Sequence, residues 1–154
     1  GDGVGVDEYL ETKAQNVFAA GDIVMLPDPV DGRPRRLEHW DNAVQQARCA
    51  TRNMMGAHTP YDNVAYFFSD VFDLSWEFWG NTEGADQVVY RGEVESGSFS
   101  VWWLRRDRLM GAFVLNRPEE ERELAPRWIH EKKEFAPGEL EGDDAFSTVA
   151  SHSD

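Results

Sequence analysis

The sequence predicts an α+β protein, in which an antiparallel sheet with flanking helices follows a short strand–loop–helix portion. Two observations lead to this prediction. Apolar residues recur with the period of a helix over 39–55, and after Pro60 the period changes to the two-residue alternation of strands. The 6 Trp and 9 Phe lie mainly between positions 66 and 113, so the densest core is expected in the sheet. The composition and the change of period predict a boundary near residue 60, and the acidic composition of the C-terminal stretch sets it apart, so three parts are predicted, residues 1–60, 61–135 and 136–154.

The first part begins with a small β unit, in which Val4 and Val6 alternate with Gly and Asp. The run 17–20 is apolar throughout and is closed by Gly21 and Asp22. This pattern is typical of a buried parallel strand whose end opens on a site. The stretch 26–37 contains three prolines and predicts a surface loop.

Residues 39–55 are predicted to form an amphipathic helix. Small or apolar residues recur on one face of it, at Trp40, Ala43, Val44, Ala47, Ala50 and Met54. Gly56 follows as the expected stop of this helix.

The second part predicts a run of strands, at 64–68, 72–78, 87–94, 99–104 and 109–115. Short connections between them imply antiparallel neighbours. A helix is expected to begin at Asn116-Arg117-Pro118, with the acidic residues 119–121 at its positive end. Pro126 is expected to break or restart that helix, because proline lacks the backbone N–H that a helix interior uses.

The charge balance argues against several classes of partner. With 29 acidic and 15 basic residues the net charge is −14, whereas nucleic-acid binding requires a basic surface. No apolar run approaches the roughly 20 residues of a membrane-spanning helix, so no membrane partner is expected. The start, Gly-Asp-Gly-Val, does not resemble a signal peptide, and a cytoplasmic location is the default expectation. The acidic tail, 136–154, is predicted to be disordered.

Metal and thiol chemistry are not predicted. The single cysteine, Cys49, lies among small residues of the predicted helix and is expected to pack rather than react. The four histidines are scattered without the spacing of metal ligands. No G-x-G-x-x-G stretch occurs, so this chain has no glycine-rich loop to hold the pyrophosphate of a dinucleotide.

Gly21 and Asp22 are the first candidates for a binding site. A strand that ends in glycine lets a ligand approach the backbone, and the next carboxylate can accept hydrogen bonds from sugar-like hydroxyls. The alternative is an ordinary turn, which Gly-Asp forms readily in any surface loop. The two residues alone leave both interpretations open, with the turn favoured.

The second candidate is the start of the predicted helix, Glu-His-Trp-Asp-Asn-Ala at 38–43. A helix N-terminus offers unpaired backbone N–H groups and a positive dipole end, which suit an electron-rich ligand edge. The alternative is that Asp41 or Asn42 caps the helix and that Trp40 belongs to the core.

Taken together, these segments resemble a known family. Val-Asp-Glu-Tyr-Leu-Glu-Thr at 6–12 and Asn-Val-Phe-Ala-Ala-Gly-Asp at 16–22 resemble the second FAD-binding motif of flavoproteins with two dinucleotide-binding domains. The 38–43 segment resembles the ferredoxin-reductase type of these proteins, which includes oxygenase-coupled ferredoxin reductases, monodehydroascorbate reductase and apoptosis-inducing factor. The stretches 66–70 and 72–80 resemble the start of the C-terminal domain of the same family, and Phe-Asp-Leu-Ser-Trp leans toward monodehydroascorbate reductase.

The resemblance implies a set of cofactor-binding residues. Asp22 would accept a hydrogen bond from the ribityl chain of FAD, and Gly21 would allow the close approach. Glu38, His39 and Trp40 would lie beside the isoalloxazine ring. No catalytic residue is implied, because hydride transfer between nicotinamide and flavin requires no acid or base at this position.

The resemblance also implies a function. Residues 1–60 would be the last strand–loop–helix portion of an α/β FAD-binding domain, and 61–135 the C-terminal reductase domain. The parent enzyme would pass electrons from NADH or NADPH through FAD to a ferredoxin, to monodehydroascorbate or to another small oxidant. This chain would then need N-terminal FAD and NAD domains, and would be inactive alone. The alternative is a non-catalytic α+β interaction or dimerisation module that binds no flavin of its own.

Overall fold

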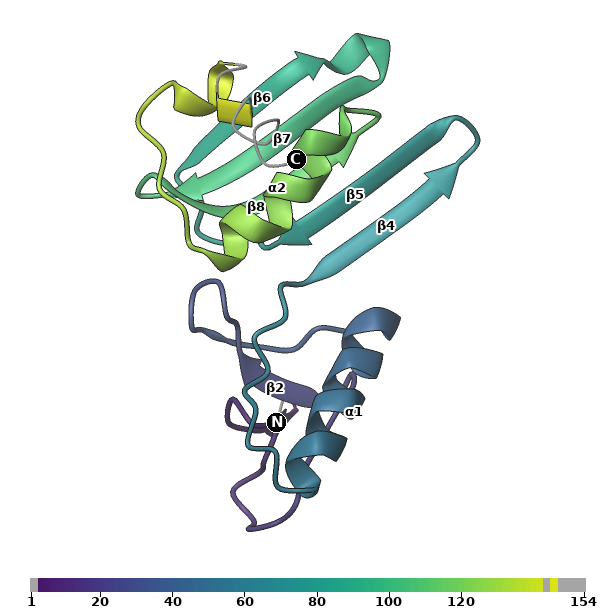
Figure 1. Cartoon of the computed structure of the whole chain (residues 1–154), viewed down its shortest axis with the longest axis vertical. Coiled ribbons are helices and arrows are strands. Elements are labelled where there is room, and N and C mark those ends of the chain that lie inside the picture. The colour runs from purple at the N-terminus through teal and green to yellow at the C-terminus, as the bar shows by residue number, and fades with distance from the viewer. Residues whose placement is uncertain (1–2, 143–144, 147–154) are drawn as a thin grey trace, which may run out of the picture. The chain divides into compact units, whose positions relative to one another are not determined.

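The computed structural model describes residues 3–142, 145 and 146, and the chain forms two units, Gly1–Asn63 and Val64–Asp154 (Figure 1). Unit 1 contains a three-stranded sheet in the order β1-β2-β3 and one long helix. β1 and β2 are parallel, and β3 runs antiparallel to β2. The bounds are β1 Val4–Gly5, β2 Val24–Pro27, β3 Pro34–Arg35 and α1 Trp40–Met54.

The core of unit 1 is small, because few of its apolar side chains are shielded from solvent. Its buried residues are Leu10, Val24, Leu26, Ala50 and Tyr61, with Val6, Phe18, Ala19 and Cys49 packed partly against them. Val17 and Ile23 are 50% and 56% exposed, although both belong to apolar runs of the sequence. Unit 1 therefore shows apolar surface that its own elements leave uncovered.

The strand predicted at 17–20 was placed wrongly. In the structure this segment makes one isolated antiparallel bridge, between Phe18 and Glu11, and the parallel strand is β2, four residues beyond Ala20. In β2, Val24 and Leu26 are buried and alternate with less buried neighbours, as in a strand. The nearby prolines, Pro27 and Pro29, made this segment resemble a loop in the sequence. Gly21 and Asp22 thus precede the strand rather than follow one.

Unit 2 contains a five-stranded antiparallel sheet in the order β4-β5-β8-β7-β6, with α2 on one face. Its strands are β4 Tyr66–Val71, β5 Leu74–Gly80, β6 Gln87–Glu93, β7 Ser98–Arg105 and β8 Arg108–Leu115. Its helices are α2 Glu119–His130 and two 3-10 turns, η1 Val94–Ser96 and η2 Glu139–Glu141. This architecture confirms the predicted α+β class and antiparallel sheet.

The core of unit 2 lies between the sheet and α2, which crosses one sheet face in Figure 1. Trp102 of β7 is fully buried, and its ring centroid lies 5.9 Å from that of Trp128 of α2. Leu124, Ala125 and Ile129 of α2 are buried on the same side. We call this side of the sheet the helix face.

Two local predictions in unit 2 were wrong. Phe72 and Asp73 form the turn between β4 and β5 rather than the start of a strand, and Phe72 has a φ of 55° with a fully exposed side chain. Pro126 lies inside α2 without breaking it. The helix continues because residues on both sides of Pro126, Leu124 and Trp128 among them, are buried against the sheet, and this packing outweighs the lost hydrogen bond.

The described part of the predicted acidic tail, residues 136–142, 145 and 146, packs on the helix face. Leu140 and Phe146 are 2% and 8% exposed. The Phe146 ring lies 5.3 Å from that of Trp102 and 5.0 Å from that of Trp128. The rest of the predicted tail lies outside the described residues.

Candidate functional site

Gly21 lies in a turn that packs on the second turn of α1. Its backbone N–H donates a hydrogen bond to Oε1 of Gln46 at 2.8 Å, and its carbonyl accepts one from the N–H of Val24 at 2.9 Å. Its φ is +88°, a conformation that favours glycine. A Cβ at this position would lie 3.7 Å from Cβ of Ala43, an ordinary contact. The backbone conformation, rather than crowding, therefore calls for glycine here.

Asp22 follows directly in the same turn, and it is exposed. The turn leads directly into β2, so the carboxylate stands at the surface beside the beginning of the strand. An exposed carboxylate next to a glycine turn is accessible to a ligand hydroxyl that approaches this surface.

The start of α1 lacks a side-chain cap. The N-cap residue is His39, which is half-buried and extended, with φ −152° and ψ 138°. The first helical hydrogen bond runs from the N–H of Ala43 to the carbonyl of His39. The backbone N–H groups of Trp40, Asp41 and Asn42 therefore have no partner within the helix.

The side chains at this helix start do not support the alternative of a capped helix with Trp40 in the core. Asp41 accepts a hydrogen bond from Gln45, and Asn42 donates one to the carbonyl of Leu37. Trp40 is 77% exposed. The indole and the uncapped N–H groups are therefore both accessible to a ligand that approaches the start of α1.

Glu38 is exposed and pairs with the guanidinium of Arg36 at 2.6 Å. Of the predicted site residues, Gly21 and Asp22 thus share one turn, and Glu38, His39 and Trp40 share the start of α1. Ala43 and Gln46 connect the two groups, because both face Gly21 from the helix that Trp40 begins.

Gln46 is a functional candidate that the sequence analysis missed. Its side chain is 4% exposed and fixes the N–H of Gly21. The signal in the sequence was a polar residue three positions after Ala43, on the face otherwise made of small residues. This hydrogen bond thus connects the turn that contains Gly21 to α1.

Among the titratable groups of unit 1, Tyr61 has the most strongly shifted pKa. It is 8% exposed and its hydroxyl donates to Oδ1 of Asn42 at 2.9 Å. Burial raises the pKa of Tyr61 to about 12, because the charged phenolate would lose solvation. The Cys49 thiol also has its pKa raised by burial, in agreement with a packing role.

We expect Tyr61 to make stability depend on pH only in alkaline solution. In the unfolded chain its pKa is near the ordinary 10.0, so between pH 10 and 12 the unfolded chain releases the proton first. The free energy of unfolding should then fall as pH rises through this window, and this contribution should be constant below pH 10. Urea unfolding of wild type and Tyr61→Phe across the window checks it. An equal decline in both proteins would contradict the assignment.

In unit 2, a polar hollow of about 740 Å³ is lined by Glu77, Asn116, Arg117, Glu119, Arg122 and Glu123. Nε of Arg122 lies 3.2 Å from Glu77, and Nη2 of Arg117 lies 2.6 Å from Glu121. Because both cations already have carboxylate neighbours, this hollow does not form an anion site. Among the described residues, no group of three or more His, Cys, Asp or Glu side chains is arranged to hold a metal ion.

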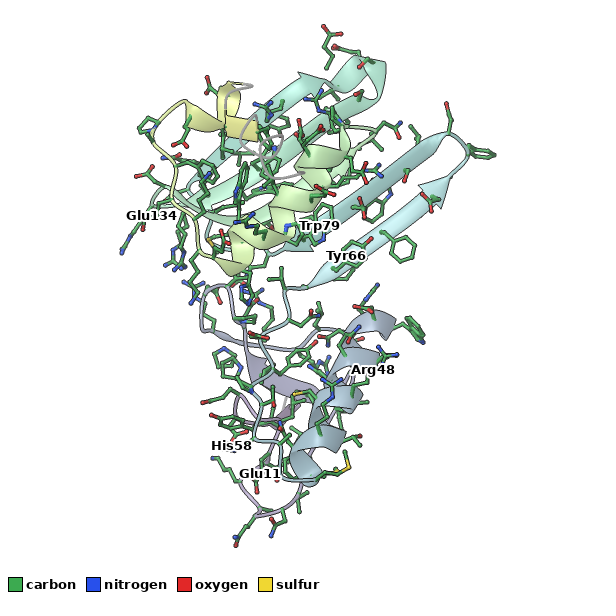
Figure 2. The ribbon with its side chains drawn as sticks, in the orientation of Figure 1. Glu11, Arg48, His58, Tyr66, Trp79 and Glu134 are labelled. Carbon is green, nitrogen blue, oxygen red and sulfur yellow. The ribbon has the colours of Figure 1, made fainter. Side chains whose placement is uncertain are left out.

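Aromatic side chains lie together at the start of β4 and the end of β5. The rings of Tyr66 and Trp79 are stacked with centroids 5.6 Å apart, and Figure 2 labels both. Tyr66 also stacks on Phe68, whose side chain is 59% exposed, and the Tyr66 hydroxyl donates a hydrogen bond to Glu77 at 2.7 Å.

Among the described residues, no helix is long and apolar enough to span a bilayer.

Comparisons with known proteins find family matches in both parts of the chain. The model of the family described as "Reductase C-terminal" matches residues 66–148, and that of "Pyridine nucleotide-disulphide oxidoreductase" matches residues 1–47. Rhodocoxin reductase from Rhodococcus erythropolis is 40% identical over 118 residues, which are 77% of this chain and 28% of that protein. The peroxisomal monodehydroascorbate reductase 4 of Arabidopsis thaliana is 36% identical over 124 residues, 79% of this chain and 25% of that protein.

Solved structures give the same result. The chain matches putidaredoxin reductase in its complex with putidaredoxin at a TM-score of 0.82 and 25% identity, covering 98% of this chain and 37% of that one. It matches the ferredoxin reductase for the CYP199A2 system from Rhodopseudomonas palustris at 0.81 and 30% identity, covering 97% and 37%. The chain therefore spans about a third or less of the proteins it resembles, and it belongs to the reductase C-terminal family of pyridine-nucleotide reductases related to ferredoxin reductases and monodehydroascorbate reductases.

Proposed function

We propose that the chain is the C-terminal part of a flavoprotein that passes electrons from NADH or NADPH through FAD to an acceptor. Unit 1 would supply one side of the FAD site. The observation that carries the proposal is the uncapped start of α1 with the exposed Trp40, tied through Gln46 to the glycine turn that presents Asp22. Residues 1–60 would complete the FAD-binding domain, and 61–135 would form the C-terminal reductase domain.

The residues present fit FAD. The carboxylate of Asp22 is exposed and can accept a hydrogen bond from a ribityl hydroxyl, and Gly21 leaves the backbone beside it without a side chain. The N–H groups of Trp40, Asp41 and Asn42 can donate to the pyrimidine edge of the isoalloxazine ring, where the positive end of α1 favours negative charge. When bound, FAD supplies the chemistry of accepting a hydride and releasing electrons.

No residue of this chain is proposed to act as an acid or base. Glu38, His39 and Trp40 would position the ring and exclude water. The pyrophosphate of FAD and the nicotinamide would be held by N-terminal FAD and NAD domains, because the sequence contains no G-x-G-x-x-G loop. The cytoplasmic location expected from the sequence stays a prediction, and the similar monodehydroascorbate reductase 4 is named as peroxisomal.

The acceptor is proposed to be a ferredoxin or a small oxidant such as monodehydroascorbate, in line with the names of the relatives. In the sequence, an acidic ferredoxin could be attracted by a local basic patch such as Arg33, Arg35 and Arg36. In the structure Nε of Arg35 lies 2.8 Å from Asp28, and Arg33 and Arg36 face Asp31 and Glu38. This pairing lowers the positive potential of the patch, so a ferredoxin would need basic residues elsewhere, whereas a small oxidant would not.

Anaerobic reduction of the complete polypeptide tests the proposal. NADH or NADPH should bleach the absorbance of bound flavin, and one acceptor should restore it when added afterwards. Recovery with monodehydroascorbate but not with ferredoxin would favour the small-oxidant form. A polypeptide that carries no flavin, or whose flavin neither nucleotide reduces, would contradict the proposed function.

A further inference from the structure

The buried face of α1 consists mainly of amide side chains, whereas the buried face of a helix is usually an apolar stripe. Its buried residues are Asn42, Gln46, Ala50 and Asn53. Gln46 binds the N–H of Gly21, and Asn53 binds both the carbonyl and the N–H of Thr59. These amides therefore fasten loops of unit 1 to the helix.

Asn42 fastens the chain that leads into α1. Its Nδ2 donates to the carbonyl of Leu37 at 3.2 Å, and its Oδ1 accepts a hydrogen bond from the hydroxyl of Tyr61 at 2.9 Å. Asn42 is the third residue of α1, a position from which glutamate or glutamine often accepts a hydrogen bond from the N–H of the N-cap residue. Here Tyr61 occupies the side-chain oxygen instead, and the start of α1 has no side-chain cap.

Tyr61 is itself held firmly in the core of unit 1. It is buried in one cluster with Leu10, and its backbone N–H donates to the carbonyl of Glu8 at 2.6 Å. Its hydroxyl also accepts a hydrogen bond from Nδ2 of Asn63 at 3.5 Å. Because burial raises the pKa of Tyr61 to about 12, the hydroxyl keeps its proton at neutral pH. The Asn42 amide thus has a fixed donor on its oxygen.

We propose that Tyr61 and Asn42 are positioning residues for the flavin ring. The Tyr61 hydroxyl orients the Asn42 amide, and this amide fixes the chain between Leu37 and Trp40 while it leaves the N–H groups at the start of α1 uncapped. Both residues act through the backbone of the helix start. The inference rests on the proposed FAD site, and it assigns the side chains that keep one part of that site open.

The uncapped start of α1 should favour reduced over oxidised FAD. Reduction adds negative charge to the pyrimidine edge, and the N–H groups and positive end of a helix stabilise such charge. In Tyr61→Phe the Asn42 oxygen loses its donor and becomes free to accept a hydrogen bond from an N–H of the first turn, in competition with the flavin. We expect this variant to lose about 10-fold more affinity for reduced than for oxidised FAD, which makes the two-electron reduction potential about 30 mV more negative.

Spectroelectrochemical titration of the FAD bound to the complete polypeptide measures this potential. Asn42→Ala should lower the potential as well, because the chain at Leu37 loses its hydrogen bond to the helix. Since Tyr61 is proposed to act through Asn42, the double variant should have the potential of Asn42→Ala alone. Shifts of Tyr61→Phe and Asn42→Ala that add up in the double variant would overturn the proposal.

Asn53→Ala is the matched control, because it also removes a buried amide that binds a loop. Asn53 is 8% exposed and Asn42 is 7% exposed, but Asn53 lies near the opposite end of α1. Urea unfolding should show a similar loss of stability in both alanine variants, whereas the potential should be unchanged in Asn53→Ala. An unchanged potential in Tyr61→Phe, or an equal shift in Asn53→Ala, would overturn the positioning role and leave the proposed function intact. A wild-type polypeptide that binds no FAD would overturn both.

Discussion

Gly80→Ala is expected to unfold unit 2 or to destabilise it by about 3–5 kcal/mol, the sum of a strained backbone and an overpacked core. Gly80 is buried at the end of β5, where it pairs with Gly111 of β8. Its φ is +79°, and an added Cβ would collide with the carbonyl oxygen of Met110 and lie 3.1 Å from Cα of Gly111. Because the colliding atoms belong to the backbone of the central strand, they cannot move aside without breaking the β5–β8 pairing.

Gly97→Ala is the matched control for this substitution. Gly97 has a similar φ of +68°, but an added Cβ would come no closer than 3.8 Å to its nearest neighbour, Cδ2 of Leu74. It should cost about 1 kcal/mol, from backbone conformation alone. Urea unfolding followed by tryptophan fluorescence measures both variants. If Gly80→Ala proves as mild as Gly97→Ala, the close approach of β5 and β8 at this point is wrong.

Arg91→Ala is expected to lower the free energy of unfolding by about 3–5 kcal/mol, because it leaves a buried carboxylate with less compensation. Arg91 is 6% exposed, and its Nε lies 3.4 Å from Oε1 of Glu121, which is 2% exposed. Its Nη1 donates to the carbonyls of Leu140 and Gly142 at 2.6 and 2.8 Å, and its guanidinium lies 4.2 Å above the ring of Phe146.

The same substitution should release the described C-terminal segment. Arg91 is the side chain that holds the carbonyls of Leu140 and Gly142, so amide exchange around η2 should become faster in the variant. Arg127→Ala serves as control, because Arg127 pairs with Glu131 at a 68% exposed position and should change stability by less than about 0.5 kcal/mol. Equal effects of the two substitutions, or unchanged exchange around η2, would contradict the role given to Arg91.

Where periodicity extended over many residues, the sequence predicted the fold well. The helix predicted at 39–55 is α1, Trp40–Met54, and the alternating strands form the antiparallel sheet. The family resemblance is confirmed by the match of residues 66–148 to the reductase C-terminal family. These predictions depend on many residues at once, so single exceptions did not alter them.

The wrong predictions concern segments whose structure is determined by a single residue or by a contact that is distant in the sequence. The apolar run 17–20 resembled a strand, but β2 with its terminal Pro27 is the segment that pairs with β1. Packing of Leu124 and Trp128 carries α2 through Pro126. After residue 136 the acidic composition predicted disorder, but Leu140 is buried and its carbonyl accepts a hydrogen bond from Arg91, 49 positions earlier in the chain.

The candidate site was predictable in part. The motifs identified Gly21, Asp22 and the helix start at 38–40, and the structure adds that α1 is uncapped and that Trp40 is exposed. The role of Gln46 was not predictable, because it follows from a contact over 25 positions between the turn and the helix. The roles of these residues toward FAD remain a prediction.

The affinity of the complete polypeptide for FAD tests the proposed site most directly. It can be measured by the quenching of flavin fluorescence, for wild type, Asp22→Ala and Asp73→Ala, which removes an exposed carboxylate of the β4–β5 turn that is not assigned to the site. Loss of a hydrogen bond to a charged group should weaken binding by about 10–100-fold in Asp22→Ala, while Asp73→Ala should bind as wild type does. Wild-type affinity in Asp22→Ala, or equal losses in both variants, would contradict the assignment of this turn to the FAD site.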